Sequence, residues 1–262
     1  MERKHIASQM NSDMNNFRND EVETIQQLVQ QLESMANPDR NAENFAGEVM
    51  ANFSRFVRTM DITRFLAIHD LFKRVQNVHG SFVEVGVLNG FNLFNLGHLS
   101  EIFEPRNYTR QILGFDTFQG YPEEFSPHDH KSATSVVDHV ETSNYDELLR
   151  SVQIFNSSVT LKQFNKIELI KGDVAETIPK TVEERPEMVV SLLLCLTDLY
   201  EPTKIALEHF LPLMPKGGVI AFAGINWSQF PGESVALKEC VNLNDVKLER
   251  LPYNTKLSFF QI

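Results

Sequence analysis

The stretch Ser81-Phe-Val-Glu-Val-Gly-Val-Leu-Asn-Gly90 decides the fold. Its first half is a short, mainly apolar run that ends at Gly86, a pattern typical of a buried strand that enters a turn. A helical pattern follows at residues 91–103. A strand, a glycine turn and a helix in succession form the first half of a parallel α/β unit. The sequence therefore predicts that a parallel sheet begins at residue 81.

Strand patterns recur along the rest of the chain, and helical patterns lie between some of them, at 174–182 and 202–213. The six further strand candidates are 111–115, 167–171, 189–196, 218–222, 246–251 and 256–261. This alternation favours a doubly wound sheet. Only Pro252-Tyr-Asn-Thr255 separates the last two candidates, which is too short for a parallel crossover. We therefore predict an α/β fold with a mostly parallel seven-stranded sheet and an antiparallel C-terminal edge.

The residues before the sheet carry helical patterns only. Apolar residues recur at intervals of three and four over 21–36, 42–57 and 62–78. We expect residues 1–79 to be a helical extension that forms a cap or a dimer surface, and residues 80–262 to be the α/β domain. The polar segment 120–143, which holds three histidines, is expected to be a loop over the carboxyl edge of the sheet.

Composition narrows the classes of partner. Lys and Arg number 24 against 35 Asp and Glu, and the net charge of -11 disfavours nucleic acid as a partner. No apolar run is long enough for a membrane span, and the first twenty residues do not resemble a secretion signal. Two cysteines, Cys195 and Cys240, are too few for a disulfide framework. We expect a cytoplasmic protein with a small-molecule substrate.

Three strand ends carry residues suited to a nucleotide-like ligand. The turn 84–90 lets a ligand approach the backbone at a helix N-terminus, Asp116 can accept both hydroxyls of a ribose, and Gly172-Asp173-Val174 places a carboxylate near an adenine amino group. Each has a simpler explanation: a tight turn, a solvated acid, and a helix cap. Together they favour one ligand site, because ligands of open α/β sheets lie at the carboxyl ends of the strands.

These motifs also carry a family resemblance. Residues 83–90, Gly114-Phe-Asp-Thr-Phe-Gln-Gly-Tyr-Pro122, Gly172-Asp-Val174 and Asp198-Leu-Tyr-Glu-Pro-Thr203 together resemble the macrocin O-methyltransferase family. Pro215-Lys-Gly-Gly218 and Pro231-Gly-Glu233 extend the match. The resemblance implies a Rossmann-like class I methyltransferase fold that binds S-adenosylmethionine, often with magnesium, and methylates a hydroxyl of a sugar or another small natural product.

Site residues follow from the strand ends and from the resemblance. The expected cofactor-binding residues are Glu84, Gly86, Asn89, Gly90, Asp116, Thr117, Asp173 and Val174. The resemblance places a catalytic base at Asp198. His128 and His130 are further candidate bases, because an imidazole pKa lies near about 6.5, although loop histidines are more often only solvated. Tyr200, Asn226 and Trp227 are candidate substrate contacts, and Trp227 can equally be core.

The metal positions depart from the family pattern. The resemblance would place magnesium-binding acids where this chain has Leu196, Ala223 and Gly224, none of which offers a side-chain oxygen. We therefore expect no metal. Three hypotheses remain open: a magnesium-independent enzyme that methylates or uses the cofactor in another reaction, a non-catalytic partner subunit or ligand sensor, and an inactivated methyltransferase. A homodimer or higher homo-oligomer is expected from the amphipathic N-terminal helices.

Overall fold

The computed structural model describes residues 22–36, 41–122, 125–129 and 144–262. They divide into two compact units, one within Met1–Ile62 and one over Thr63–Ile262. The boundary lies inside helix α3 (Thr59–Val75), upstream of the predicted domain start at residue 80. Most of α3 belongs to the second unit because its buried residues are part of that unit's core: Ala67, Ile68, Leu71, Phe72 and Val75.

The described residues of the first unit are mostly helical, as the periodicity predicted. Residues 22–35 form a helix, and α2 (Ala42–Ala51) and a short 3-10 turn, η1 (Phe53–Arg55), follow. The Asn41 side chain begins α2 by accepting a hydrogen bond from the Glu43 backbone N–H at 2.9 Å. The α-helix ends before the predicted residue 57, because the chain tightens into η1 after Asn52.

The second unit contains a sheet of seven strands in the order β3-β2-β1-β4-β5-β7-β6. The strands are β1 (Ser81–Val85), β2 (Ile112–Asp116), β3 (Ile167–Lys171), β4 (Val190–Cys195), β5 (Val219–Phe222), β6 (Glu249–Leu251) and β7 (Asn254–Gln261). Strands β1 to β5 pair in parallel, and β7 is antiparallel to both β5 and β6. The predicted fold class and the antiparallel C-terminal edge are confirmed.

The register aligns the carboxyl ends of four strands. Val85 of β1 pairs with Phe115 of β2 and with Cys195 of β4, which in turn pairs with Phe222 of β5. The residues that follow these four therefore leave the sheet along one edge. The strand order reverses between β1 and β4, the place where open α/β sheets bind ligands.

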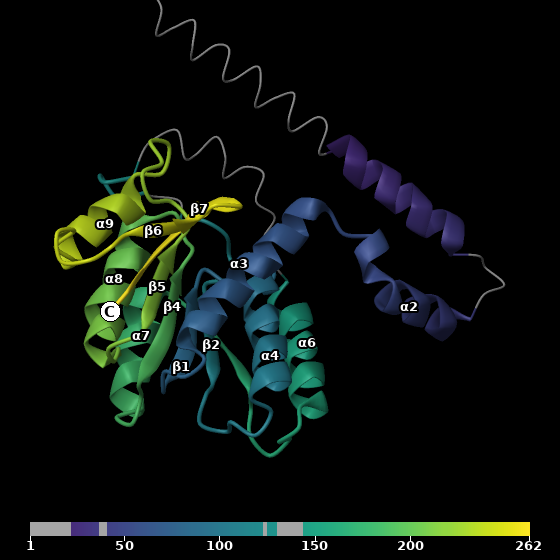
Figure 1. Cartoon of the computed structure of the whole chain (residues 1–262), viewed down its shortest axis with the longest axis horizontal. Coiled ribbons are helices and arrows are strands. Elements are labelled where there is room, and N and C mark those ends of the chain that lie inside the picture. Colours follow the sequence, from purple (N-terminus) through teal and green to yellow (C-terminus); the bar gives the residue numbers. More distant parts are fainter. Residues whose placement is uncertain (1–21, 37–40, 123–124, 130–143) are drawn as a thin grey trace, which may run out of the picture. The chain divides into compact units, whose positions relative to one another are not determined.

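Helices cover both faces of the sheet (Figure 1). One layer is α3, α4 (Phe91–Phe103) and α6 (Tyr145–Ser158), and the other is α7 (Val174–Glu184), α8 (Tyr200–Phe210) with the turn η3 (Leu211–Leu213), and α9 (Gly232–Cys240). Each layer shares a buried apolar cluster with the sheet. Helices α6 and α9 were not predicted, whereas α4, α7 and α8 were. Among the described residues, no helix is both long and apolar enough to cross a bilayer.

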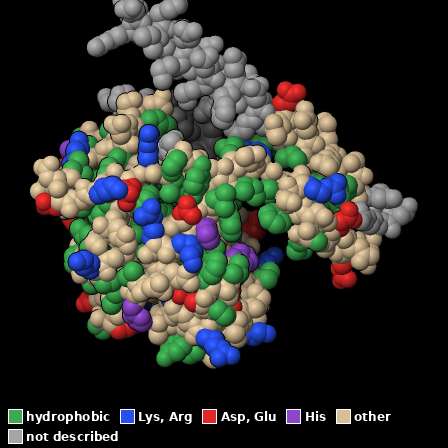
Figure 2. Space-filling view, viewed as in Figure 1, with side chains coloured by type: hydrophobic (Ala, Val, Ile, Leu, Met, Phe, Trp, Pro, Cys, Tyr) green, Lys and Arg blue, Asp and Glu red, His purple; other side chains and the backbone are tan. Residues whose placement is uncertain are grey.

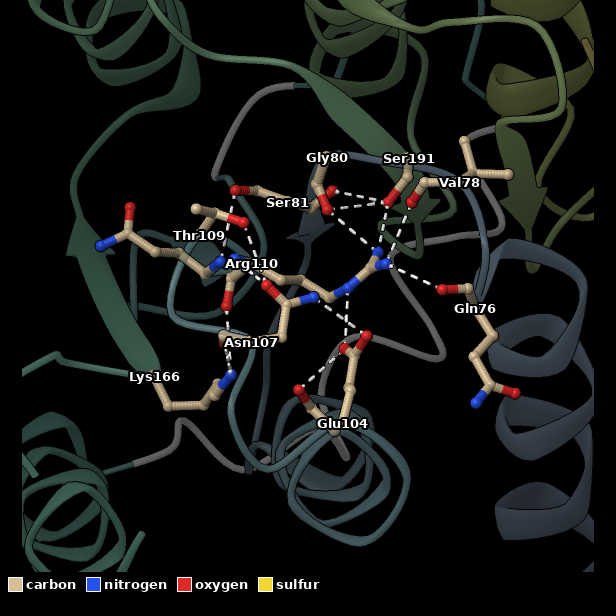
Figure 3. Close-up of polar contacts among 12 residues, drawn as sticks. Gln76, Val78, Gly80, Ser81, Glu104, Asn107, Thr109, Arg110, Lys166 and Ser191 are labelled. Carbon is tan, nitrogen blue, oxygen red and sulfur yellow. Dashed lines mark hydrogen bonds and ion pairs between the residues drawn. The ribbon is translucent and has the colours of Figure 1, made fainter. Parts of the chain in front are cut away.

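A buried arginine joins the amino ends of the strands, opposite the ligand edge. The Arg110 guanidinium donates to the Gly80 carbonyl at 3.0 Å and to Ser191 Oγ at 2.7 Å, and it lies 2.7 Å from a Glu104 carboxylate oxygen (Figure 3). It also donates to the Val78 carbonyl at 3.0 Å. These contacts connect the residues before β1 with β4 and with the C-terminal end of α4. They therefore hold together the strands that carry the site.

Charged side chains of both signs are mixed on one face of the molecule. On the face shown in Figure 2, Lys and Arg side chains are interspersed with Asp and Glu among the described residues. This distribution differs from the single-sign stripe that a nucleic-acid backbone requires.

Candidate functional site

The turn after β1 brings the backbone close to the next strand. Gly86 has φ 92°, and a Cβ placed there would lie 2.7 Å from the Leu196 carbonyl oxygen. Gly90, with φ 77°, caps the N-terminus of α4. Both glycines are thus required by conformation, and Gly86 also by space. Asn89, between them, is exposed.

Asp116 lies at the end of β2 and holds two loops. One of its carboxylate oxygens accepts the Leu88 N–H at 3.0 Å and the other accepts the Phe118 N–H at 2.8 Å. The Gly172 N–H donates to the Asp116 carbonyl at 3.0 Å. The three strand ends singled out in the sequence are therefore adjacent. Thr117 accepts the Gln119 N–H at 3.2 Å, which shapes the same loop.

Asp173 acts as a helix cap. Its carboxylate accepts the Ala175 N–H at 2.9 Å at the start of α7. Its side chain is exposed and Val174 is half-buried, so both remain reachable from solvent. Capping by one oxygen leaves the other free to accept a further donor.

Glu84 lies behind the turn. Its side chain is fully buried, and one oxygen accepts the Asn92 side-chain N–H at 2.7 Å. Asn92 in turn accepts from Arg64 Nε at 3.1 Å. The second Glu84 oxygen has no hydrogen-bond partner, and burial raises the pKa of this carboxyl to about 8. The structure places Glu84 as a support beneath the turn, away from its exposed surface.

Asp198 follows β4 in an unusual conformation. Its φ of 61° lies in the left-handed region, which Asp tolerates better than most residues. Its Oδ1 atom is buried without a hydrogen-bond partner, and burial raises the pKa of the carboxyl, while Lys256 lowers it. A carboxyl with a raised pKa is a stronger base when ionised.

A second acid, Glu233 of α9, lies against Asp198. Its side chain is fully buried; one oxygen accepts the Asp198 N–H at 2.9 Å and the other accepts the Gly224 N–H at 2.6 Å. Burial first, and the charge of Asp198 second, raise the pKa of Glu233 to about 8. In the sequence, Glu233 is notable only as part of the Pro231-Gly-Glu233 motif. A charged residue in the first turn of a helix gives no sign that it is buried.

The described part of the loop after β2 contacts α8. Asp129 accepts the Tyr200 N–H at 3.0 Å, and the His128 ring lies 4.3 Å from the Tyr200 ring. The Tyr200 hydroxyl donates to Glu239 at 2.8 Å. His128 is exposed and forms no described contact with Asp198, and His130 lies outside the described residues.

Asn226 and Trp227 follow β5. Asn226 is exposed with φ 62°, and its N–H donates to Ser234 Oγ at 2.9 Å. Trp227 is half-buried against the Phe230 ring at 4.7 Å. Phe222, the last residue of β5, is fully buried.

Of the three positions expected to lack metal ligands, Gly224 lies against these acids. Leu196 packs against the buried core, and a Cβ on Gly224 would lie 3.0 Å from Asp198 Oδ1 and 3.2 Å from Glu233 Oε2. In the described part of the chain, no group of three or more His, Cys, Asp or Glu side chains is arranged to hold a metal ion.

Comparison with known proteins decides the family. The family model described as macrocin O-methyltransferase (TylF) matches residues 3–241, which is most of the chain. The chain belongs to the macrocin O-methyltransferase family. The resemblance predicted from the motifs is thereby confirmed, and the protein is an S-adenosylmethionine-dependent methyltransferase-like enzyme. No curated protein gives a significant match.

Solved structures agree with this family assignment. The calicheamicin methyltransferase CalS11 is 29% identical, covers 92% of both chains and superposes with a TM-score of 0.80. Its apo form, described as a TDP-rhamnose 3'-O-methyltransferase, is 30% identical over 92% of this chain and 94% of CalS11, with a TM-score of 0.76. The O-methyltransferase NovP, at 22% identity, 76% and 79% coverage and a TM-score of 0.61, shares the fold.

Within this macrocin O-methyltransferase fold, sequence reasoning missed residues that act through burial. Glu233 and the Asn92 and Arg64 pair behind Glu84 are the main examples. Tyr121 is another: burial raises its pKa first, and the charges of Asp198, Glu233 and Asp116 raise it further. Cys195 of β4 is fully buried, and burial raises the pKa of its thiol.

Proposed function

We propose that this protein is a methyltransferase of natural-product biosynthesis that uses S-adenosylmethionine without magnesium. The observation that carries the proposal is the juxtaposition of three features at one edge of the sheet: the Gly86 turn, the Asp116 carboxylate and the buried Asp198 carboxylate. Gly86 closely approaches Leu196, two residues before Asp198. Tyr121 lies within the electrostatic influence of both Asp116 and Asp198.

The residues at this edge fit the cofactor. S-adenosylmethionine, when bound, supplies a methyl group made electrophilic by the sulfonium. Asp116 would accept the ribose hydroxyls with the lone pairs left after its two backbone contacts. The Gly86 turn would admit the amino-acid end against the backbone near the α4 N-terminus. Asp173 and Val174 would contact the adenine, and Asn89, Gly90 and Thr117 would line the same site.

Asp198 would act as the general base. Its unpartnered Oδ1 can accept the proton of an acceptor hydroxyl or amine, and burial makes it more basic than a solvated carboxylate. Tyr200, Asn226 and Trp227 would contact the acceptor, with His128 and His130 as further candidate bases.

The inference that magnesium is not used rests on three positions near Asp198. Leu196, Ala223 and Gly224 offer no side-chain oxygen, and a hard divalent cation takes oxygen ligands. Alignment of the acceptor with the methyl group is then the main source of rate, which suits an acceptor that is already reactive.

A sugar-bearing intermediate is the acceptor class that we favour. CalS11, similar over nearly the whole chain, is described as acting on TDP-rhamnose. The test is transfer of radiolabelled methyl from S-adenosylmethionine to TDP-rhamnose and to amino- and hydroxy-deoxysugar nucleotides, with EDTA or with magnesium. We expect transfer in EDTA and its loss in Asp198→Asn, with Asp245→Asn as a matched surface control. Transfer only with magnesium would refute metal independence.

A non-methylating use of the cofactor is the second candidate. It is favoured by Leu196, Ala223 and Gly224, which offer no metal ligand near Asp198. Without a metal ion, nothing at these positions lowers the pKa of an ordinary acceptor hydroxyl. Substrate consumption in the same assay without appearance of labelled product would support it. Cofactor binding with no consumption of any acceptor would instead favour a partner subunit or ligand sensor.

We also propose that the N-terminal extension mediates homo-oligomer formation. Val22, Ile25 and Val29 are 53%, 42% and 45% exposed on the helix at residues 22–35. An amphipathic helix with an uncovered apolar stripe suits association with a partner. Sedimentation of the full chain and of Ile25→Glu should show a dimer that the substitution weakens; a monomeric full chain would contradict this.

A further inference from the structure

Glu233 connects two strand ends through one carboxylate. It reaches from the first turn of α9 to the Asp198 N–H beyond β4 and to the Gly224 N–H beyond β5. The side chain is fully buried, so water cannot replace either bond. The backbone that it holds at Asp198 is in the left-handed region, which surrounding contacts must stabilise.

Two glycines, which lack a Cβ atom, leave the space that this arrangement needs. A Cβ on Gly224 would be within 3.2 Å of both the Asp198 and the Glu233 carboxylates, so the two groups approach one point. A Cβ on Gly232 would lie 2.4 Å from the Tyr200 nitrogen, so α9 can begin this close to α8 only with glycine there. An acid at position 224 and an acid at position 233 therefore compete for the same space.

We propose that Glu233 is the positioning residue of Asp198: its carboxyl group fixes the backbone of the base and shares a single proton with it. This inference rests on the proposed role of Asp198 in methyl transfer. Two buried carboxyls this close do not both ionise readily. At neutral pH the pair therefore holds one proton and one negative charge, and the ionised carboxyl can accept the proton of the substrate.

Other titratable groups also face the Asp198 and Glu233 pair. Lys256 of β7 favours ionisation of Asp198, whereas the Tyr121 phenol and the Cys195 thiol, both with raised pKa, stay neutral beside the pair. Lys256 is exposed, so solvent weakens its effect. The raised pKa of Glu233 agrees with a proton held within the pair.

The test is a pH titration of side-chain carboxyl signals by NMR, on protein labelled with carbon-13 at Asp and Glu, without cofactor or acceptor. In the wild type we expect the Asp198 signal to respond in two steps, the upper one shared with Glu233. Glu233→Gln should remove the upper step. Asp198→Asn should lower the pKa of Glu233 by roughly one unit or more. Glu201→Gln, an exposed acid on α8, is the matched control and should change neither signal.

Each outcome decides the proposal. Coupling must be reciprocal, so Asp198→Asn alone tests it even where Glu233→Gln does not fold. One-step titration of Asp198 with no response of Glu233 to Asp198→Asn would overturn the shared proton. The measurement needs no turnover: coupling without methyl transfer in the sugar-nucleotide assay would overturn the proposed function, whereas methyl transfer without coupling would overturn this inference alone.

Discussion

Asp116 supports two loops and still has lone pairs for a ligand. We expect Asp116→Ala to weaken S-adenosylmethionine binding roughly 10- to 100-fold, because hydrogen bonds to a charged group contribute about 1.5 to 3 kcal/mol. Isothermal titration calorimetry measures the change. Asp245→Ala, which removes an exposed acid in a turn, is the control and should bind as the wild type does. Equal affinity in Asp116→Ala would remove Asp116 from the cofactor site.

Gly224 and Glu233 form a testable pair. Gly224→Asp would bring a third carboxylate against Asp198 and Glu233, and we expect it to lower the free energy of unfolding by about 1 to 3 kcal/mol. The double variant with Glu233→Ala should recover part of this loss, with a coupling of about 0.5 to 3 kcal/mol by urea denaturation. Additive effects would show that the two positions do not compete for space.

The sequence predicted the turns and strand ends of the candidate site better than its buried contacts. The positions of Gly86, Asp116 and Asp173 at or just after strand ends were predicted, because turns and strand ends follow local patterns. Glu233 was not, because its role depends on the approach of α9 to the ends of β4 and β5, a contact between segments distant in sequence. Glu84 was found, but its burial behind Asn92 was not foreseen.

At the scale of elements, Arg110 holds the amino ends of the central strands. Removing one partner of a buried ion pair leaves the other without compensation, so we expect Arg110→Ala to lower the free energy of unfolding by about 3 to 5 kcal/mol. Arg106→Ala, an exposed arginine nearby, should have an effect below about 0.5 kcal/mol. Urea denaturation of both variants provides the comparison, and similar small losses would contradict the role given to Arg110.

Most elements with regular patterns were predicted, and α6 is an exception. Strand β3 and helix α4 have the predicted bounds because apolar runs and periodicity define them. Helix α6 was missed, although its buried stripe of Leu148, Val152 and Phe155 has helical spacing. Helix α9 is short, and Gly232 stands at its start, so little in its sequence distinguishes it from a loop.

At the scale of the whole molecule, buried acids connect pH with stability. Glu84 and Glu233 have pKa values raised from 4.5 to about 8. Each therefore binds its proton more tightly in the folded state than in the unfolded state. The stability gained in this way is fully present below about pH 4.5 and is lost as pH rises to about 8. Glu84→Gln should flatten the fall in the free energy of unfolding across this range, by up to about 1.4 kcal/mol per pH unit. Glu187→Gln, an exposed acid, is the control. An unchanged slope in Glu84→Gln would contradict the buried, protonated state.

The central claim is that this member of the macrocin O-methyltransferase family binds its cofactor independently of magnesium. Calorimetric titration of the full chain with S-adenosylmethionine, in EDTA and then in magnesium, tests it most directly. We expect saturable binding with the same affinity in both conditions. Binding that requires magnesium, or no binding in either condition, would contradict it.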